Sequence, residues 1–186
     1  MLPNPKQPER ATVPPFPPED HVCAGCELSY ADLTPPAAIE LIRSYPARYR
    51  GCLEHLPDPV LRRRPDPQTW SALEYACHVR DVYGVYHCRI SSALTRDDPV
   101  LAPMHNDERA KREGYNRQDL TDVLDTLRRN IDRFVALANE IGADQWNRTA
   151  SRLPGERRTV AWMVRQAAHE GLHHLRDIAD RDPGCR

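Results

Sequence analysis

Apolar residues recur every three or four positions along four stretches of the chain, which is the spacing of one buried face of an α-helix. The clearest stretch lies between Asp119 and Gly142, where the apolar positions are Leu120, Leu124, Leu127, Ile131, Phe134 and Ile141. From Thr34 onward we find no convincing alternating strand pattern and no internal repeat. The pattern therefore predicts an all-α protein.

Helix start signals place the other three helices. Thr34-Pro35 is an N-cap followed by Pro at the first helical position. Ser71 to Glu74 reads Ser-Ala-Leu-Glu, a capping box, and the Pro154-Gly155 turn precedes a start near Thr159. The four expected helices cover residues 34–56, 71–94, 119–142 and 159–180. Helices of this length with a long link between the second and third predict a four-helix bundle.

The first part of the chain has a different composition. Seven of the 18 Pro residues fall within the first 18 positions, with few apolar residues among them. Such a stretch buries too little apolar surface to offset its ordering entropy, so we expect an extended or disordered arm. We therefore divide the chain into a Pro-rich N-terminal arm, residues 1–33, and a helical bundle, residues 34–182.

Charge and hydropathy exclude some classes of binding partner. The net charge is −1 and the pI about 6.7, so the chain lacks the excess of positive charge that is typical of nucleic-acid-binding proteins. No apolar run approaches the roughly 20 residues of a membrane span, and the start lacks the hydrophobic stretch of a signal peptide. We expect a cytoplasmic protein without nucleic-acid or membrane partners. In that reducing compartment its thiols should be free, including four without ligand-like spacing: Cys52, Cys77, Cys88 and Cys185.

The chemistry concentrates near the C-terminus, in HEGLHHLRDI. His169 and His173 are four residues apart, so on a helix they lie on one side and can share a metal. Their H-E-x-x-H spelling matches zinc peptidases, but Arg176 and Ala179 stand where the extended motif requires Gly and His. Because only 13 residues follow His173, a downstream third ligand has little room. We therefore disfavour a peptidase.

A third imidazole is available on the second predicted helix, at His78. Three imidazoles and an open position are typical of a catalytic zinc site, and they also suit nickel, iron or manganese. Asp81 and Asp177 each lie within one turn of a candidate ligand and could orient an imidazole from behind. Glu170 is a further residue of this outer layer, because its side chain lies about 100° from the His169/His173 face.

The position of the histidine pair on its helix suggests an exposed site. The small apolar stripe of the same helix faces well away from the pair; it consists of Val164, Ala168, Gly171, Leu175 and Ile178. We expect His169 and His173 to line an open, wet cleft with Trp162 nearby. The same pattern is compatible with simple surface histidines.

Two motifs together resemble the DinB/YfiT-like superfamily: TWSALEYACHVRDV, residues 69–82, and AAHEGLHHLRDI, which ends at Ile178. The resemblance extends over about residues 34–180. It implies a DinB-like four-helix bundle with a long helix 2–helix 3 crossover, and a divalent metal, most often zinc, on His78, His169 and His173. Several actinobacterial members of the family use such a site for mycothiol-dependent transfer or isomerisation, and the Arg-, Ala- and Pro-rich composition fits an actinobacterial source.

Three hypotheses for function follow. The first is a metal-dependent S-transferase acting on a small-molecule substrate with a low-molecular-weight thiol, because metal coordination deprotonates a thiol whose free pKa is about 8.5. The second is a metal-dependent hydrolase of an amide or ester on the same bundle, in which Glu170 could act as base although its side chain lies about 100° from the ligand face. The third is a noncatalytic helical protein that binds metal or a small ligand, or forms a homodimer through its small-residue faces.

The arm carries its own motif, HVCAGC, in which Cys23 and Cys26 have the C-x2-C spacing of a zinc knuckle. The knuckle offers two thiolates, and His21 is a third candidate ligand for a second, structural zinc. A complete site would need a partner from the bundle, and the sequence offers His55, His87, Cys88 and His105 without ranking them. Reduced unliganded thiols and redox chemistry are the alternatives, although no βαβ pattern supports a thioredoxin-like role.

Overall fold

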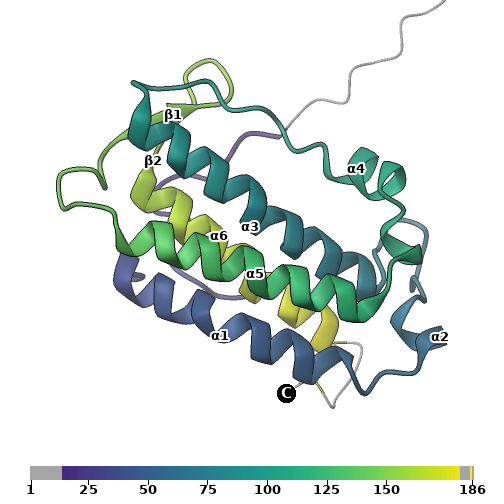
Figure 1. Ribbon diagram of the computed structural model, residues 1–186. Helices are drawn as coiled ribbons and strands as arrows, with labels where there is room; N and C mark the ends of the chain where they lie inside the picture. Colours follow the sequence, from purple (N-terminus) through teal and green to yellow (C-terminus); the bar gives the residue numbers. More distant parts are fainter. Residues whose placement is uncertain (1–13, 181–184, 186) are drawn as a thin grey trace, which may run out of the picture.

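The computed structural model describes residues 14–180 and residue 185, and its four long helices form a bundle (Figure 1). The helices are α1 (Pro35–Leu53), α3 (Ala72–Thr95), α5 (Leu120–Asn139) and α6 (Val160–Ala179). The all-α fold and the long crossover between the second and third bundle helices are thus confirmed. Each helix begins directly after an N-cap whose side-chain oxygen accepts a backbone N–H bond: Thr34, Ser71, Asp119 and Thr159. The predicted starts agree with these caps, whereas α1 and α5 end about three residues earlier than predicted.

Helix α6 lies between α1 and α3. Both α1 and α3 pack against α5 and α6, so α1 and α3 occupy diagonal corners of the bundle. Three buried Tyr hydroxyls donate hydrogen bonds to carbonyl groups of α6, pairing Tyr45 with Ala168, Tyr49 with Gly171 and Tyr83 with Ala167. Because these bonds come from two neighbouring helices, they fix the rotation of α6 about its own axis. That rotation decides which side chains of α6 face which neighbour.

The connections carry short elements outside the bundle. Helix α2 (Asp58–Leu61) follows α1, and the crossover before α5 contains α4 (Asn106–Arg112) and the 3-10 helix η1 (Tyr115–Arg117). Strands β1 (Thr149–Ser151) and β2 (Arg157–Thr159) form an antiparallel pair that leads directly into α6. Strands of three residues are too short to show an alternating pattern, which explains why the sequence did not predict them.

The N-terminal segment, residues 14–33, packs along α6 (Figure 1). The ring of Phe16 lies 4.9 Å from that of Trp162, whose indole N–H donates to the Pro18 carbonyl at 3.2 Å. The described part of the predicted arm is therefore attached to the bundle, and it folds back on itself through a β-bridge between Val22 and Ser29. The Pro-rich residues 1–13 lie outside the described residues, so the expectation for them stays a prediction.

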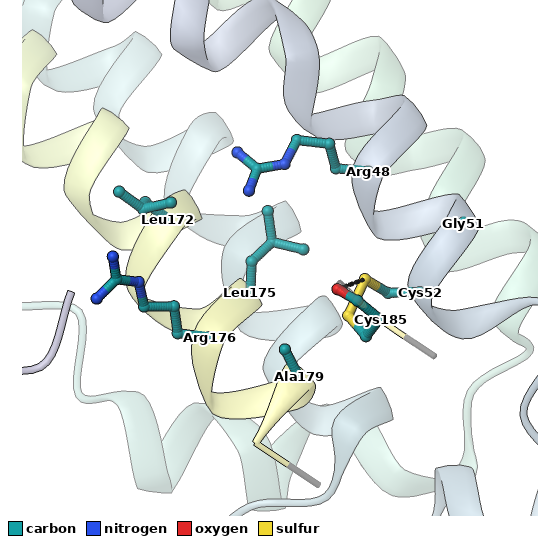
Figure 2. Close-up of a pocket in the computed structure, with 8 residues that line it drawn as sticks. All are labelled: Arg48, Gly51, Cys52, Leu172, Leu175, Arg176, Ala179 and Cys185. Atoms are coloured by element: carbon teal, nitrogen blue, oxygen red, sulfur yellow. Dashed lines mark hydrogen bonds between the residues drawn. A yellow bond between two sulfur atoms is a disulfide. The ribbon is translucent and has the colours of Figure 1, made fainter. Parts of the chain in front are cut away.

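The C-terminal end of the described chain returns to α1, where Cys185 forms a disulfide with Cys52 (Figure 2). The expectation of free thiols is wrong for this pair, because a separation of 133 residues hides their proximity in the sequence. Cys77 and Cys88 are free, as expected.

A pocket of about 430 Å³ lies beside the disulfide, between Arg48 of α1 and Leu172 of α6. Among the described helices, none is long and apolar enough to cross a membrane.

Candidate functional site

The side chains of residues 169–174 of α6 face three neighbouring parts of the structure: the N-terminal segment, α3 and α1. Successive helix residues differ by about 100°, so residues four apart share a side and adjacent residues do not. His169 and His173 face the N-terminal segment, whereas Glu170 and His174 face α3, and Gly171 packs against Tyr45 of α1. Within the described residues this stretch takes part in three groups of candidate metal ligands: one with α3, one with the N-terminal segment, and a third of His173, His174 and Asp177 that shares one histidine with each of the other two.

The first group, which we call the α3 cluster, consists of His78, Glu170 and His174. Each residue offers one donor atom, and the three atoms lie within 4.8 Å of one another. The Nε2 atoms of His78 and His174 lie 3.2 and 3.4 Å from the same oxygen, Oε2 of Glu170. The convergence of two imidazoles on one carboxylate oxygen defines the site.

Neighbouring side chains hold these donors in place. The Nδ1–H of His174 donates to Oδ2 of Asp177 at 2.7 Å, so its Nε2 is turned toward Glu170. The other oxygen of Glu170 accepts a hydrogen bond from the Gln166 amide at 2.7 Å. The predicted orienting role of Asp177 therefore has a matching contact, made to His174 more closely than to His173, whose Nε2 lies 3.8 Å away.

The charges of the α3 cluster follow from burial and pairing. Burial alone would raise the pKa of Glu170, but hydrogen bonds from His174 and His78 hold it well below its ordinary value. Burial likewise opposes protonation of His174, yet its bonds to Asp177 and Glu170 raise its pKa to about 9. Burial lowers the pKa of His78 despite its contact with Glu170. The site thus holds a carboxylate between a neutral and a charged imidazole, and a cation could replace the protons.

The residues of the α3 cluster fit a divalent metal. Two imidazoles and one carboxylate are the protein ligands of several catalytic zinc sites, and of non-haem iron sites as well. The contact between Asp177 and His174 is the carboxylate–imidazole arrangement that accompanies metal-bound histidines. His78 is almost fully buried, while the side chains of Glu170 and His174 remain 22% and 15% exposed, which leaves one side open.

Two aromatic rings pack against the histidines of the α3 cluster. The ring of Trp70 lies 5.1 Å from that of His78, and the ring of Tyr75 stacks on that of His174 at 4.9 Å. Both aromatic residues are half-buried. Trp70 lies just before α3, and Tyr75 lies in its first turn. They form an apolar rim beside the polar donors.

The second group, the knuckle cluster, consists of Cys23, Cys26, His169 and His173, whose donor atoms also lie within 4.8 Å of one another. The Cys23 sulfur lies 3.4 Å from Nδ1 of His173. Both Cys residues are buried, and burial raises the pKa of the Cys26 thiol to about 11. Burial lowers the pKa of His169 to about 4, so its imidazole is neutral at physiological pH.

The structure divides the predicted triad between these two clusters. His78 lies with Glu170 and His174, while His169 and His173 lie with the two Cys residues. The N-terminal segment packs over the face of α6 that carries the histidine pair and leaves the His173 side chain 33% exposed, so the pair lies on a partly covered face and not along the expected open cleft. Trp162, expected beside that cleft, is fully buried.

The remaining residues that the sequence suggested for the metal sites, His21 and Asp81, belong to neither cluster. His21 packs with its ring centroid 5.7 Å from that of His169 but is outside the knuckle cluster. The Asp81 carboxylate accepts hydrogen bonds from Tyr115 and Arg80 at 2.6 and 2.8 Å, so its observed partners are not the ligands.

Sequence reasoning missed His174 as a candidate ligand and Glu170 as a direct one. The available signal was the spacing of Glu170 and His174, which are four residues apart like the histidine pair.

Comparisons with known proteins agree with this architecture. A family model described as the DinB superfamily matches residues 41–178. A protein of Halalkalibacterium halodurans, provisionally named a metal-dependent hydrolase, is 25% identical over 140 residues, which cover 75% of this chain and 81% of that protein. Among solved structures, YfiT from Bacillus subtilis matches with a TM-score of 0.73 and 16% identity, over 91% of this chain and 94% of that one. Its structure is described as that of a probable metal-dependent hydrolase with an unusual four-helix bundle topology.

Proposed function

The chain belongs to the DinB superfamily, and from this premise we propose that it is a metal-dependent hydrolase of a small amide or ester, with its divalent ion on the α3 cluster. The observation that carries the proposal is the convergence of the His78 and His174 imidazoles on Oε2 of Glu170. The relatives named above support the same class, since both are described as metal-dependent hydrolases.

Each residue of the site has a distinct role in this proposal. His78, Glu170 and His174 would hold the metal, which lowers the pKa of a coordinated water or thiol and polarises a substrate carbonyl. Asp177 orients His174, and Gln166 fixes the free oxygen of Glu170. Glu170 is thus assigned as a ligand, so the general-base role suggested by a peptidase motif is not needed.

The rim indicates which part of a substrate would be recognised. Trp70 and Tyr75 offer apolar ring surface next to the opening, and aromatic rings favour contact with an apolar or planar group. A small substrate with an apolar group beside its scissile carbonyl would satisfy both the rim and the polar donors.

Thiol-dependent transfer, which the family resemblance implies, is the second candidate. Three neutral imidazoles would leave a divalent ion its full charge, whereas the carboxylate of Glu170 reduces the local positive charge by one. A less positive site attracts a thiolate less strongly, and a site of two imidazoles and a carboxylate is typical of zinc hydrolases. The donor set therefore supports hydrolysis ahead of transfer. Zinc fits these donors best, and nickel, iron and manganese are compatible with them.

The first experiment tests the metal. The full-length protein is stripped with a chelator, reloaded with zinc, and analysed for bound metal after removal of free ions. His78→Ala and His174→Ala should each lose the ion of the α3 cluster. His87→Ala is the matched control, because His87 lies on the same helix outside either cluster. Unchanged metal content in His78→Ala would contradict the assignment.

The second experiment tests the reaction. Zinc-loaded protein is incubated with a panel of small aryl amides and esters, with and without a low-molecular-weight thiol. Metal-dependent cleavage that needs no thiol supports the hydrolase, and Glu170→Ala should reduce it to the level of metal-free protein. Consumption of thiol and electrophile together, without hydrolysis, would favour the transferase.

A further inference from the structure

We propose that Cys23, Cys26, His169 and His173 form a closed structural zinc site that fastens the N-terminal segment to α6. The site is distinct from the α3 cluster in its ligands and in the face of α6 that it uses. The proposal stands on the contacts of the knuckle cluster and does not depend on which reaction the α3 cluster performs.

The backbone around the two Cys residues forms a tight hairpin. The backbone N–H of Cys23 donates a hydrogen bond to the Leu28 carbonyl at 3.0 Å, and the N–H of Glu27 donates to the Cys23 carbonyl at 2.7 Å. The N–H of Cys26 points at the Cys23 sulfur at 3.4 Å. A backbone N–H directed at a sulfur stabilises a thiolate, the form in which Cys binds metal.

Helix α6 meets this hairpin closely. At Gly25, between the two Cys residues, an added Cβ would lie 2.8 Å from Cε1 of His173. The Gly25 carbonyl accepts a hydrogen bond from Arg176 at 3.1 Å, one turn further along α6. The hairpin therefore packs directly over the imidazole that completes the cluster.

One ring nitrogen of His169 has no hydrogen-bond partner among the described residues. The Tyr30 hydroxyl donates its only proton to Oε1 of Gln166 at 2.5 Å, so its oxygen must accept from Nδ1–H of His169 at 2.9 Å. The proton of the neutral ring is thus on Nδ1, and Nε2 carries a lone pair. Nε2 is buried and has no hydrogen-bond partner within the described residues. A bound cation would satisfy this nitrogen.

The donor set identifies the ion and the kind of site. Two thiolates and two imidazoles are soft and borderline ligands that select zinc over magnesium, calcium or manganese. Cys23 and Cys26 are only 8% and 1% exposed, and four protein ligands leave no position for substrate. The site is therefore structural. It joins two distant segments of the chain, because His169 follows Cys26, the nearest ligand of the other segment, by 143 positions.

The same contacts connect this site to the α3 cluster. Gln166 accepts from Tyr30 and donates to Glu170, so a hydrogen-bonded series runs from His169 through Tyr30 and Gln166 to Glu170. A zinc ion that fixes the N-terminal segment therefore also fixes the carboxylate of the α3 cluster. Loss of the structural zinc should weaken metal binding at the α3 cluster.

Cobalt substitution tests the proposal, because thiolate ligands give bound cobalt(II) a charge-transfer band in the near ultraviolet. Full-length protein loaded with cobalt should show this band, and Cys26→Ser should lose most of it together with about one metal ion per chain. Cys88→Ser is the matched control, since Cys88 is an exposed free thiol outside the cluster. A band of unchanged intensity in Cys26→Ser would overturn the proposal.

Two further measurements keep the outcome interpretable. His78→Ala should retain the thiolate band even if it loses its own metal, so failure at the α3 cluster and failure at the knuckle cluster give different spectra. Should Cys26→Ser not fold, alkylation of the unmodified protein replaces it. Zinc-loaded protein should protect Cys23 and Cys26 from a maleimide until a chelator is added. Protection that is the same with and without chelator would count against the site.

Discussion

Gly171 lies against the ring of Tyr45 so closely that a Cβ on Gly171 would be 2.3 Å from Cε2 of Tyr45 and 2.7 Å from the Tyr83 hydroxyl. No side chain fits there without moving α6 away from its neighbours. Because Gly171 stands between the ligands of both clusters, its small size is needed for the geometry of each.

The first prediction concerns this contact. Gly171→Ala should destabilise the protein by about 1–3 kcal/mol, the usual cost of overpacking a buried position, despite the better helix propensity of Ala. Chemical denaturation measures the change, and metal content should fall with it. Gly51→Ala is the control, because nothing lies within 4 Å of its Cβ in α1. It should stabilise by up to about 1 kcal/mol. Equal effects of the two substitutions would contradict the packing argument.

The second prediction concerns the Tyr30 hydroxyl. Tyr30→Phe removes the acceptor for His169 Nδ1–H and should lower zinc affinity of the knuckle cluster about 10- to 100-fold, as losses of such outer contacts do. Competition with a chromophoric chelator measures the affinity. Tyr83→Phe also deletes a hydroxyl that bonds to α6 but touches no ligand, so it should leave zinc affinity unchanged. A similar loss in both variants would show that general destabilisation is responsible.

The third prediction concerns Asp177. Asp177→Asn keeps the shape of the side chain but removes the charge that orients His174, so metal affinity at the α3 cluster should fall about 10- to 100-fold. The thiolate–cobalt band should be weakened much less, since Asp177 is 3.8 Å from His173. Asp132→Asn, on the exposed side of α5, provides the control. Full metal affinity in Asp177→Asn would exclude an orienting role.

The fourth prediction concerns pH. Burial raises the pKa of Glu74, but hydrogen bonds from Arg64 and the Ser71 backbone outweigh it and hold the pKa below the ordinary 4.5. A depressed carboxyl pKa contributes stability above the unfolded value, and this contribution is lost as pH falls through the folded value. Glu74→Gln should cost about 1–3 kcal/mol at neutral pH, and the difference from the unmodified protein should shrink below pH 4.5.

Denaturation at a series of pH values checks this dependence. Glu40→Gln is the control, because its ion pair with Arg43 is exposed and should contribute little at any pH. A Glu74→Gln deficit that stays constant down to strongly acidic pH would contradict the assignment.

Local signals predicted the bundle well. Ser71 and Glu74 form the expected capping box, and Thr34, Asp119 and Thr159 cap the other helices. These features act within a few residues, so they can be read from adjacent positions. Helix ends were predicted less well, since α1 stops at Leu53 and α5 at Asn139 without a Gly directly after either helix.

The grouping of ligands needed information that is not local. The spacing of His169 and His173 correctly placed them on one side of a helix, but not which neighbour that side meets. That neighbour is set by Tyr45, Tyr49 and Tyr83, whose hydroxyls fix the rotation of α6. The covering of α6 by Pro-rich residues was hidden as well, because composition predicts the behaviour of a free arm and not of one attached to a partner surface.

The packing of residues 169–174 limits the sequence changes that this stretch can tolerate. His169 and His173 contact one neighbour, Glu170 and His174 a second, and Gly171 a third, so five of these six positions are constrained, from three directions in all. An insertion or deletion there would rotate every following side chain onto the wrong partner. Leu172 is outside both clusters and lines the pocket beside the disulfide (Figure 2). Natural variation in this turn should therefore concentrate at Leu172.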